Sequence, residues 1–419
     1  MVLKKLIFCN LDLIKVALDV NDYEGISFTD ADKEKFKKKR EKFIEKFHEL
    51  SEDTDNKIYF YSRKADALKG YESLMKYNGY TNFVFKDRSA LKEFVTSNKD
   101  KNNYFVFVGA KNKDFELAVN TRSLFIVPTW LPLEDRPARY GIHVDSVKQL
   151  YKFILTLNNQ NTWYSRLEID DISTAYSLMD ARYGKYAETM EEKEMVENFQ
   201  KLLKENRSQS YRRILLYHFL AGMTNTMDFD DIELFGMIPS SSCRLNEYVF
   251  DFMNEVRLLK GKQLPKRYPA DTAPEDTNLL IRHTAKTQAH IGKTWQDRIR
   301  LGCKEEFATL CINPDYKKRI EKLKAEGRFN VCIFDDYMTH GNSFNAVRNL
   351  LKTLGANKIV FVSLGLFRNP FQKKDYTITG NVYGKDYTFQ LETVKALDDF
   401  EINNDAKKEV SDLHDIFYA

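Results

Sequence analysis

Short apolar runs alternate with amphipathic stretches along most of this chain, and this alternation limits the possible fold more than any other feature. LIFC (6–9), FVFV (105–108) and VCIF (331–334) are typical of these runs, and none of the three contains a charged residue. Strands that are buried on both faces have this composition, and they occur in parallel sheets covered by helices. The pattern therefore predicts an α/β protein.

The alternation occurs in two blocks. In the first block the expected strands are the apolar runs at 3–11, 57–62, 82–86, 103–110 and 123–130. In the second block the expected strands are 231–239, 328–334 and 357–367. Residues 375–393 alternate with period 2, which predicts an antiparallel pair of strands.

The segment between the blocks differs from both of them. Residues 145–222 are expected to be mostly helical, with a solvated helix at 191–206. A chain of 419 residues is also too long for one ordinary core. We therefore predict two domains, each a mainly parallel sheet flanked by helices, at 1–160 and 226–419, joined by a helical connector at 161–225.

Composition excludes some classes of protein. The formal net charge is only +4, so nucleic acid is neither required nor excluded as a partner. The five cysteines form no CxxC pair and their number is odd, which favours a reducing compartment. No apolar run approaches the roughly 20 residues of a membrane span, and the N-terminus is typical of a first strand and not of a signal peptide. We expect a cytoplasmic protein without a membrane partner.

One stretch combines groups that suit a ligand. Asp335 and Asp336 directly follow the expected strand at 328–334, and a loop with Thr339, Gly341 and Ser343 leads into a helix. Ligands of open α/β sheets bind beyond the carboxyl ends of strands, and a helix N-terminus there favours phosphate. Carboxylates accept hydrogen bonds from hydroxyl groups. Carboxylates beside a phosphate-binding loop match a ribose 5-phosphate, which has vicinal hydroxyl groups at one end and a phosphate at the other.

The same residues carry a resemblance. FDDYMTHGNSF (334–344) resembles the phosphoribosyl diphosphate (PRPP) motif of type I phosphoribosyltransferases. The resemblance implies that Asp335 and Asp336 are the catalytic pair that contacts the ribose hydroxyls. His340 departs from the family pattern, which has Thr or Ser at that position. The residues that the resemblance assigns to the 5-phosphate are Thr339, His340, Gly341, Asn342 and Ser343.

Two further stretches resemble parts of this family. ELFGMIPSSSCR (233–244) is similar to the loop that holds the pyrophosphate, although a plain serine-rich turn would also explain it. Residues 281–308 resemble the mobile hood of the ComF-like branch, and a solvated basic helix is the alternative. The residues implied for the pyrophosphate loop are Ser240, Ser241, Ser242 and Arg244, and those implied for the hood are Arg282, Lys286 and Gln288.

The resemblance implies a reaction class. Pyrophosphate would leave C1 of the sugar, a nucleobase-like nitrogen would add, and Mg²⁺ would act while bound to the pyrophosphate, with no metal site assigned to protein residues. The alternative is a sensor that binds PRPP or a nucleotide without turnover. A third possibility is an effector in a bacterial stress or phage-defence system, where such domains occur together. An oligomer is possible.

The first block carries a second resemblance. LIFCNLDLI (6–14) is similar to the first motif of the haloacid dehalogenase (HAD) superfamily, with Asn10 at the position of the nucleophilic aspartate. Asp12, Ser62 and Asp114 fit other positions of the HAD motifs. Because an amide is a poor nucleophile, we expect a HAD-like fold without phosphatase activity. Such a domain would bind a nucleotide, a phosphate or a protein partner, and an unrelated α/β domain is the alternative.

Overall fold

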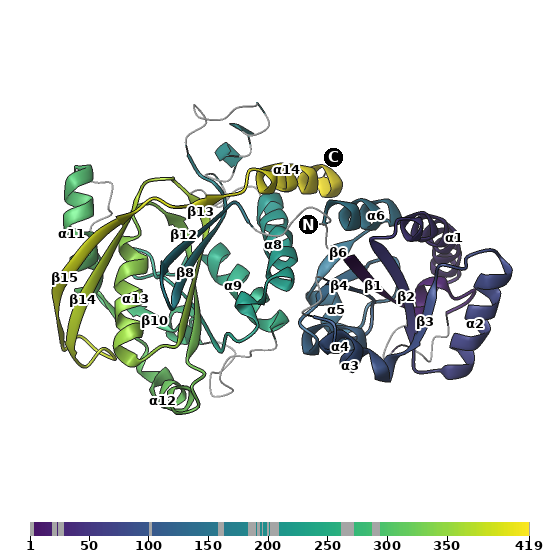
Figure 1. The fold of residues 1–419 in the computed structure, drawn as a ribbon, viewed down its shortest axis with the longest axis horizontal. Helices are drawn as coiled ribbons and strands as arrows, with labels where there is room; N and C mark the ends of the chain where they lie inside the picture. The colour runs from purple at the N-terminus through teal and green to yellow at the C-terminus, as the bar shows by residue number, and fades with distance from the viewer. Residues whose placement is uncertain are drawn as a thin grey trace.

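The computed structural model of the chain is shown in Figure 1. It describes residues 4–18, 23, 29–99, 103–157, 163–182, 209–260, 272–286 and 294–418, and a few positions between 190 and 201. The chain forms two six-stranded sheets, each with helices packed against it, and two smaller two-stranded sheets. The predicted α/β architecture with two sheets is confirmed.

The first sheet has six parallel strands in the order β3-β2-β1-β4-β5-β6. Its central strands contain the runs of consecutive apolar residues from which they were predicted. The strands are β1 (Lys4–Asn10), β2 (Asn56–Ser62), β3 (Val84–Asp87), β4 (Asn103–Val108), β5 (Leu124–Pro128) and β6 (Ile142–Val144). The helices of this part are α1 (Asp30–Glu52), α2 (Ala65–Tyr77), α3 (Leu91–Thr96), α4 (Asn112–Asn120), α5 (Asp135–Arg139) and α6 (Val147–Thr156).

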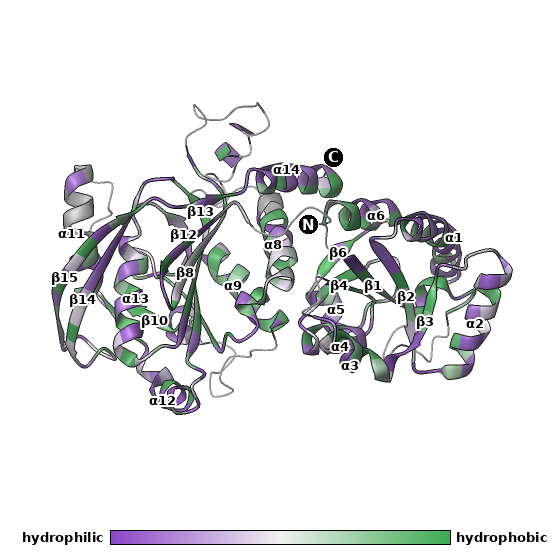
Figure 2. Ribbon diagram, in the orientation of Figure 1, coloured by the Kyte–Doolittle hydropathy of each residue, from purple (hydrophilic) through white to green (hydrophobic). Residues whose placement is uncertain are grey.

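Helices cover both faces of this sheet. Ile7, Val106 and Ile126 pack in one apolar cluster with residues of α1 and α6. Phe8 and Phe107 belong to a separate cluster with residues of α3 and α4. Figure 2 shows hydrophobic residues on β4 and β6 and hydrophilic residues on parts of β1 and β2, whereas α1 is hydrophilic over much of its surface. Burial on both faces explains why these strands lack polar alternation.

The second sheet is mixed. Its order is β16-β7-β8-β13-β12-β9, in which β8, β13, β12 and β9 are parallel and β7 is antiparallel to both of its neighbours. The strands are β7 (Ser165–Asp170), β8 (Ser173–Asp180), β9 (Leu234–Met237), β12 (Asn330–Met338), β13 (Lys358–Leu366) and β16 (Glu401–Ile402).

Two small antiparallel sheets complete this part of the chain. One pairs β10 (Leu280–Arg282) with β11 (Leu310–Ile312), and the other pairs β14 (Phe371–Gly380) with β15 (Tyr387–Leu397). The second of these confirms the antiparallel pair predicted at 375–393. The helices are α8 (Gln209–Asn225), α9 (Glu247–Leu259), α10 (Pro274–Thr277), α11 (Trp295–Phe307), α12 (Lys317–Ala325), α13 (Asn342–Leu354) and α14 (Asp405–Tyr418).

One prediction about the connector is wrong. Residues 165–180 form the hairpin β7–β8 and belong to the second sheet, so the segment 161–225 is not a helical connector. In SRLEID (165–170) buried and exposed side chains alternate, which is a strand pattern with period 2. The solvated helix expected at 191–206 lies mostly outside the described residues.

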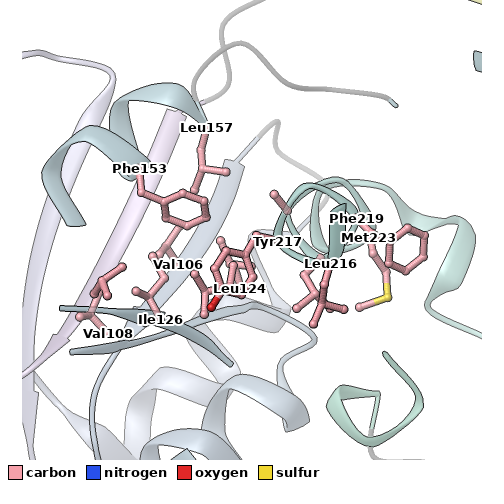
Figure 3. Packing of buried hydrophobic residues seen from close by; sticks show 14 of the residues in the cluster. Val106, Val108, Leu124, Ile126, Phe153, Leu157, Leu216, Tyr217, Phe219 and Met223 are labelled. Carbon is pink, nitrogen blue, oxygen red and sulfur yellow. The ribbon is translucent and has the colours of Figure 1, made fainter. Parts of the chain in front are cut away.

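Helix α8 packs against both sheets. Its residues 214–223 are all buried, and Leu216 and Tyr217 lie near Leu124 of β5 in Figure 3. The hydroxyl of Tyr104 on β4 donates to the Ala221 carbonyl of α8 at 3.1 Å. Apart from His218, which pairs with Glu409, this segment has no charged or titratable imidazole side chain, and a helix segment that is apolar on nearly all sides is typical of a buried position. The two sheets therefore share one apolar cluster that runs through α8.

None of the helices in the described part of the chain combines the length and the apolar character that crossing a membrane requires.

Candidate functional site

The acidic pair lies inside a strand and not behind it. Strand β12 continues to Met338, and Asp335 is opposite Ser363 of β13 in the parallel register. The sequence predicted that the strand would end at residue 334. The difference arises because β13 is nine residues long and offers a pairing partner beyond that point. The pair still stands near the carboxyl end of β12, where α/β proteins bind ligands.

The two carboxyl groups are held side by side. The backbone N–H of Asp336 donates to Oδ1 of Asp335 at 2.9 Å, and that of Tyr337 donates to Oδ1 of Asp336 at 2.7 Å. Both aspartates keep part of their surface exposed. Burial of its carboxyl group and the neighbouring Asp336 carboxylate raise the pKa of Asp335 well above its ordinary value. Hydroxyl groups or a cation placed against this pair would relieve that repulsion.

A glycine begins the helix behind the pair. Gly341 is the N-cap of α13 with φ of +73°, and it offers no capping side chain. A Cβ atom at this position would lie 2.0 Å from the Phe371 ring of β14. The carbonyl of Gly341 also accepts from the backbone N–H of Asn345 at 2.8 Å. The turn therefore requires glycine and leaves the positive end of α13 without a side-chain acceptor from its N-cap.

The predicted phosphate loop is the connection between β12 and α13. Thr339 is exposed, and Asn342 and Ser343 are partly exposed at the start of the helix. The backbone carbonyl of His340 accepts from the N–H of Gln372 at 3.1 Å. One side of the loop is thus fixed to β14, and the Thr339 side chain lies at its surface.

The serine-rich loop lies next to this strand. Strand β9 pairs with β12, and Ile238 N–H donates to the Phe334 carbonyl at 2.9 Å. The loop then turns tightly, because Ser240 N–H donates to the Arg244 carbonyl at 2.8 Å. The Oγ atoms of Ser240 and Ser242 lie 2.9 Å apart. Within this turn Cys243 adopts φ of +67°, a strained conformation for a residue with a side chain.

Two residues expected in the hood occupy different environments. Arg282 is only 4% exposed, and its guanidinium donates to the Pro239 carbonyl at 3.0 Å, to Thr309 and to Glu306. Its donors are therefore directed at protein groups. The backbone N–H of Lys286 donates to the Ser241 carbonyl at 2.9 Å. Gln288 lies outside the described residues.

Glu306 connects these segments, and sequence reasoning missed it. Its carboxylate is 2% exposed and accepts from the Ser343 hydroxyl at 2.9 Å, from Arg282 at 2.7 Å and from the Lys286 ammonium. Burial opposes its charge, yet Lys286 and Arg282 hold the pKa of Glu306 below its ordinary value. The sequence did not single out Glu306, because the basic stretch 281–308 also contains Asp297 and Glu305.

The corresponding edge of the first sheet contains a second polar cluster. Asn10 ends β1, and its amide donates to Asp114 Oδ1 at 3.0 Å and to Asp114 Oδ2 at 2.8 Å. Asp114 is fully buried, and this burial raises the pKa of its carboxyl group. Ser62 ends β2 on the neighbouring strand, and its hydroxyl accepts from the Lys64 N–H at 3.1 Å.

Asp12 has cationic partners that the sequence did not indicate. Its carboxylate lies 2.6 Å from the Lys15 ammonium and 2.7 Å from the Lys111 ammonium, and it accepts from the Tyr23 hydroxyl at 2.8 Å. Burial favours the neutral acid, but the two ammonium groups hold the pKa of Asp12 below its ordinary value. A carboxylate already paired with two cations has little remaining negative charge to offer Mg²⁺.

No group of three His, Cys, Asp or Glu side chains in the described ranges is arranged to hold a metal ion. The oxygen atoms of Asp335 and Asp336 are nevertheless of the kind that Mg²⁺ prefers. Two carboxylates fit a metal that arrives with phosphate ligands of its own.

Comparisons of the chain with protein-family models, with curated proteins and with solved structures gave no match.

Proposed function

We propose that the carboxyl edge of the second sheet binds PRPP or a nucleotide and that the protein acts as a phosphoribosyltransferase. One observation carries the proposal: the Asp335–Asp336 pair, the glycine-led start of α13 and the serine-rich loop meet at this edge. The acidic pair suits the vicinal hydroxyl groups of a ribose, and the start of α13 suits a 5-phosphate. The serine-rich loop offers hydroxyls and backbone N–H groups to a pyrophosphate.

These residues would work mainly by position and charge. In the proposed reaction the bond from C1 to the pyrophosphate oxygen breaks with its electron pair. A nucleobase-like nitrogen then donates a pair to C1 and loses a proton. The acidic pair would orient the ribose while positive charge develops on the sugar, and Lys286 would face the departing anion. Mg²⁺ bound to the pyrophosphate would neutralise part of the leaving group's charge.

We propose a binding role for the first sheet. A hydrolytic phosphatase of the HAD type needs an aspartate nucleophile, and Asn10 offers an amide that donates to Asp114 instead. Asp12 is paired with Lys15 and Lys111. These contacts favour a module that binds a phosphate-containing ligand or a protein partner without hydrolysis.

Turnover and binding can be separated in one assay. The full chain is incubated with PRPP, Mg²⁺ and a panel of nucleobases, and pyrophosphate release is followed. We expect release with at least one base and none in the absence of Mg²⁺. If no base supports release while PRPP still binds, the transferase proposal is overturned in favour of a sensor.

A further inference from the structure

The carboxylate of Glu306 lies against the first turn of α13. It accepts from the hydroxyl of Ser343 in the first turn of α13 and pairs with Lys286 and Arg282. A hydroxyl at a helix N-terminus together with two cations is a donor set that binds phosphate. We infer that Glu306 is an internal anion that competes with the ligand for this site and so sets its affinity. The inference rests on the proposed function and concerns the regulation of the same site.

The helix that carries Glu306 is seated closely on the loop. A Cβ atom on Gly302 would lie 2.2 Å from Nδ2 of Asn342, and the Cys303 thiol donates to the Asn342 carbonyl at 3.4 Å. Because α11 and α13 touch here, Glu306 stays beside Ser343 unless α11 shifts. The competing carboxylate is therefore held in place by backbone packing and not by its own side-chain contacts alone.

The three partners of Glu306 differ in their freedom to turn to a ligand. The Arg282 side chain is 1% exposed and also donates to Pro239 and Thr309. The Lys286 side chain is 16% exposed, and Ser343 is partly exposed. Ser343 is thus the group that the 5-phosphate would take over and Lys286 the group that the pyrophosphate would take over, while Arg282 remains with Glu306.

The charge of Glu306 also acts on the acidic pair. Burial of the Asp335 carboxyl is the main cause of its raised pKa and Asp336 is the next, but Glu306 adds to both. A ligand phosphate that draws Lys286 away would leave the Glu306 carboxylate and the Asp335–Asp336 pair less well screened from each other. This opposing charge makes ligand binding weaker than the donor set alone would allow.

The test uses Glu306→Gln, which keeps the shape of the side chain and removes its charge. The neighbouring Glu305→Gln is the matched control on the same helix. Each full-length variant is titrated calorimetrically with inorganic pyrophosphate and with PRPP, both with Mg²⁺. We expect Glu306→Gln to bind both ligands about tenfold more tightly, since a charge-assisted hydrogen bond is released to the ligand. Glu305→Gln should match the wild type.

A second variant covers the case in which Glu306→Gln fails to fold, as judged by circular dichroism. Glu306→Asp keeps the charge but shortens the side chain by one methylene, which draws the carboxylate back toward α11 and away from Ser343 and Lys286, so it should also tighten binding. Unchanged or weaker binding in a folded variant overturns the inference. If PRPP binding depends on Asp335 but not on Glu306, the inference alone fails. If pyrophosphate binds more tightly to the variant and PRPP binds to no protein, the inference stands and the proposed function fails.

Discussion

Replacing Phe219 by alanine is expected to lower the free energy of unfolding by about 3 to 5 kcal/mol, the range for a large aromatic side chain removed from a core. Phe219 lies on α8 and is completely buried. Its ring stacks on Trp163 at a centroid distance of 5.0 Å. It also meets Phe229 and Phe252 at 5.5 Å and Phe334 at 5.7 Å. No single neighbour can fill the space left by a ring with four aromatic contacts.

The measurement is urea unfolding followed by far-ultraviolet circular dichroism and by tryptophan fluorescence. Because α8 packs on both sheets, the two probes should report one transition that moves to lower urea. The control is Tyr77→Ala on α2, whose side chain is 89% exposed, and its effect should be within about 0.5 kcal/mol. Two separate transitions, of which only one moves, would contradict the view that α8 joins the sheets.

Arg282→Met is expected to lower the free energy of unfolding by a comparable amount, about 3 to 5 kcal/mol. The substitution breaks a buried ion pair and leaves the charge of the Glu306 carboxylate poorly compensated. The side chains of Arg282 and Glu306 are 1% and 3% exposed. The guanidinium also holds the Pro239 carbonyl at the start of the serine-rich loop. Methionine can fill much of the volume but supplies no donor to these groups.

Thermal and urea unfolding of the purified variant would measure this loss. The control is Arg319→Met, which removes an arginine from a pair with Glu233 at 3.2 Å on a side chain that is 47% exposed. That change should cost at most about 1 kcal/mol. A loss for Arg282→Met no larger than that of the control would show that Arg282 is not a structural anchor and would favour a direct role at the ligand.

The strands that sequence predicts best are those with consecutive apolar residues. Strands β1, β4 and β13 are covered on both faces, so they are apolar along their length and can be predicted from their own residues alone. The hairpin β7–β8 was missed because it lies between two segments with helical patterns, although buried and exposed side chains alternate along β7.

The site was predictable where its residues are neighbours in the chain. Asp335, Asp336, Gly341 and Ser343 fall within one short stretch, and the structure confirms that this stretch is a strand, a turn and a helix. Glu306 was not predictable, because its contact with Ser343 spans 37 positions. Ion pairs of this kind depend on how helices pack, and sequence periodicity does not encode that.

The first sheet illustrates the same limit. The position of Asn10 at the end of a strand follows from the apolar run before it. Its amide contact with Asp114 crosses 104 positions, and the pairing of Asp12 with Lys111 is also long-range. The sequence identified the polar groups at this edge, but only the fold shows that they form hydrogen bonds and ion pairs with one another.

We propose that the Asp335–Asp336 pair binds the sugar of PRPP. The most direct measurement is calorimetric titration of Mg²⁺–PRPP into the wild type and into the double variant Asp335→Asn with Asp336→Asn. The matched control replaces Asp398 and Asp399 by asparagine, since these are also adjacent aspartates but are exposed and lie after β15. We expect PRPP to bind to the wild type and the control, and about 100-fold more weakly to the double variant, since two charge-assisted hydrogen bonds are weakened. Equal affinity of all three proteins for PRPP would contradict this proposal.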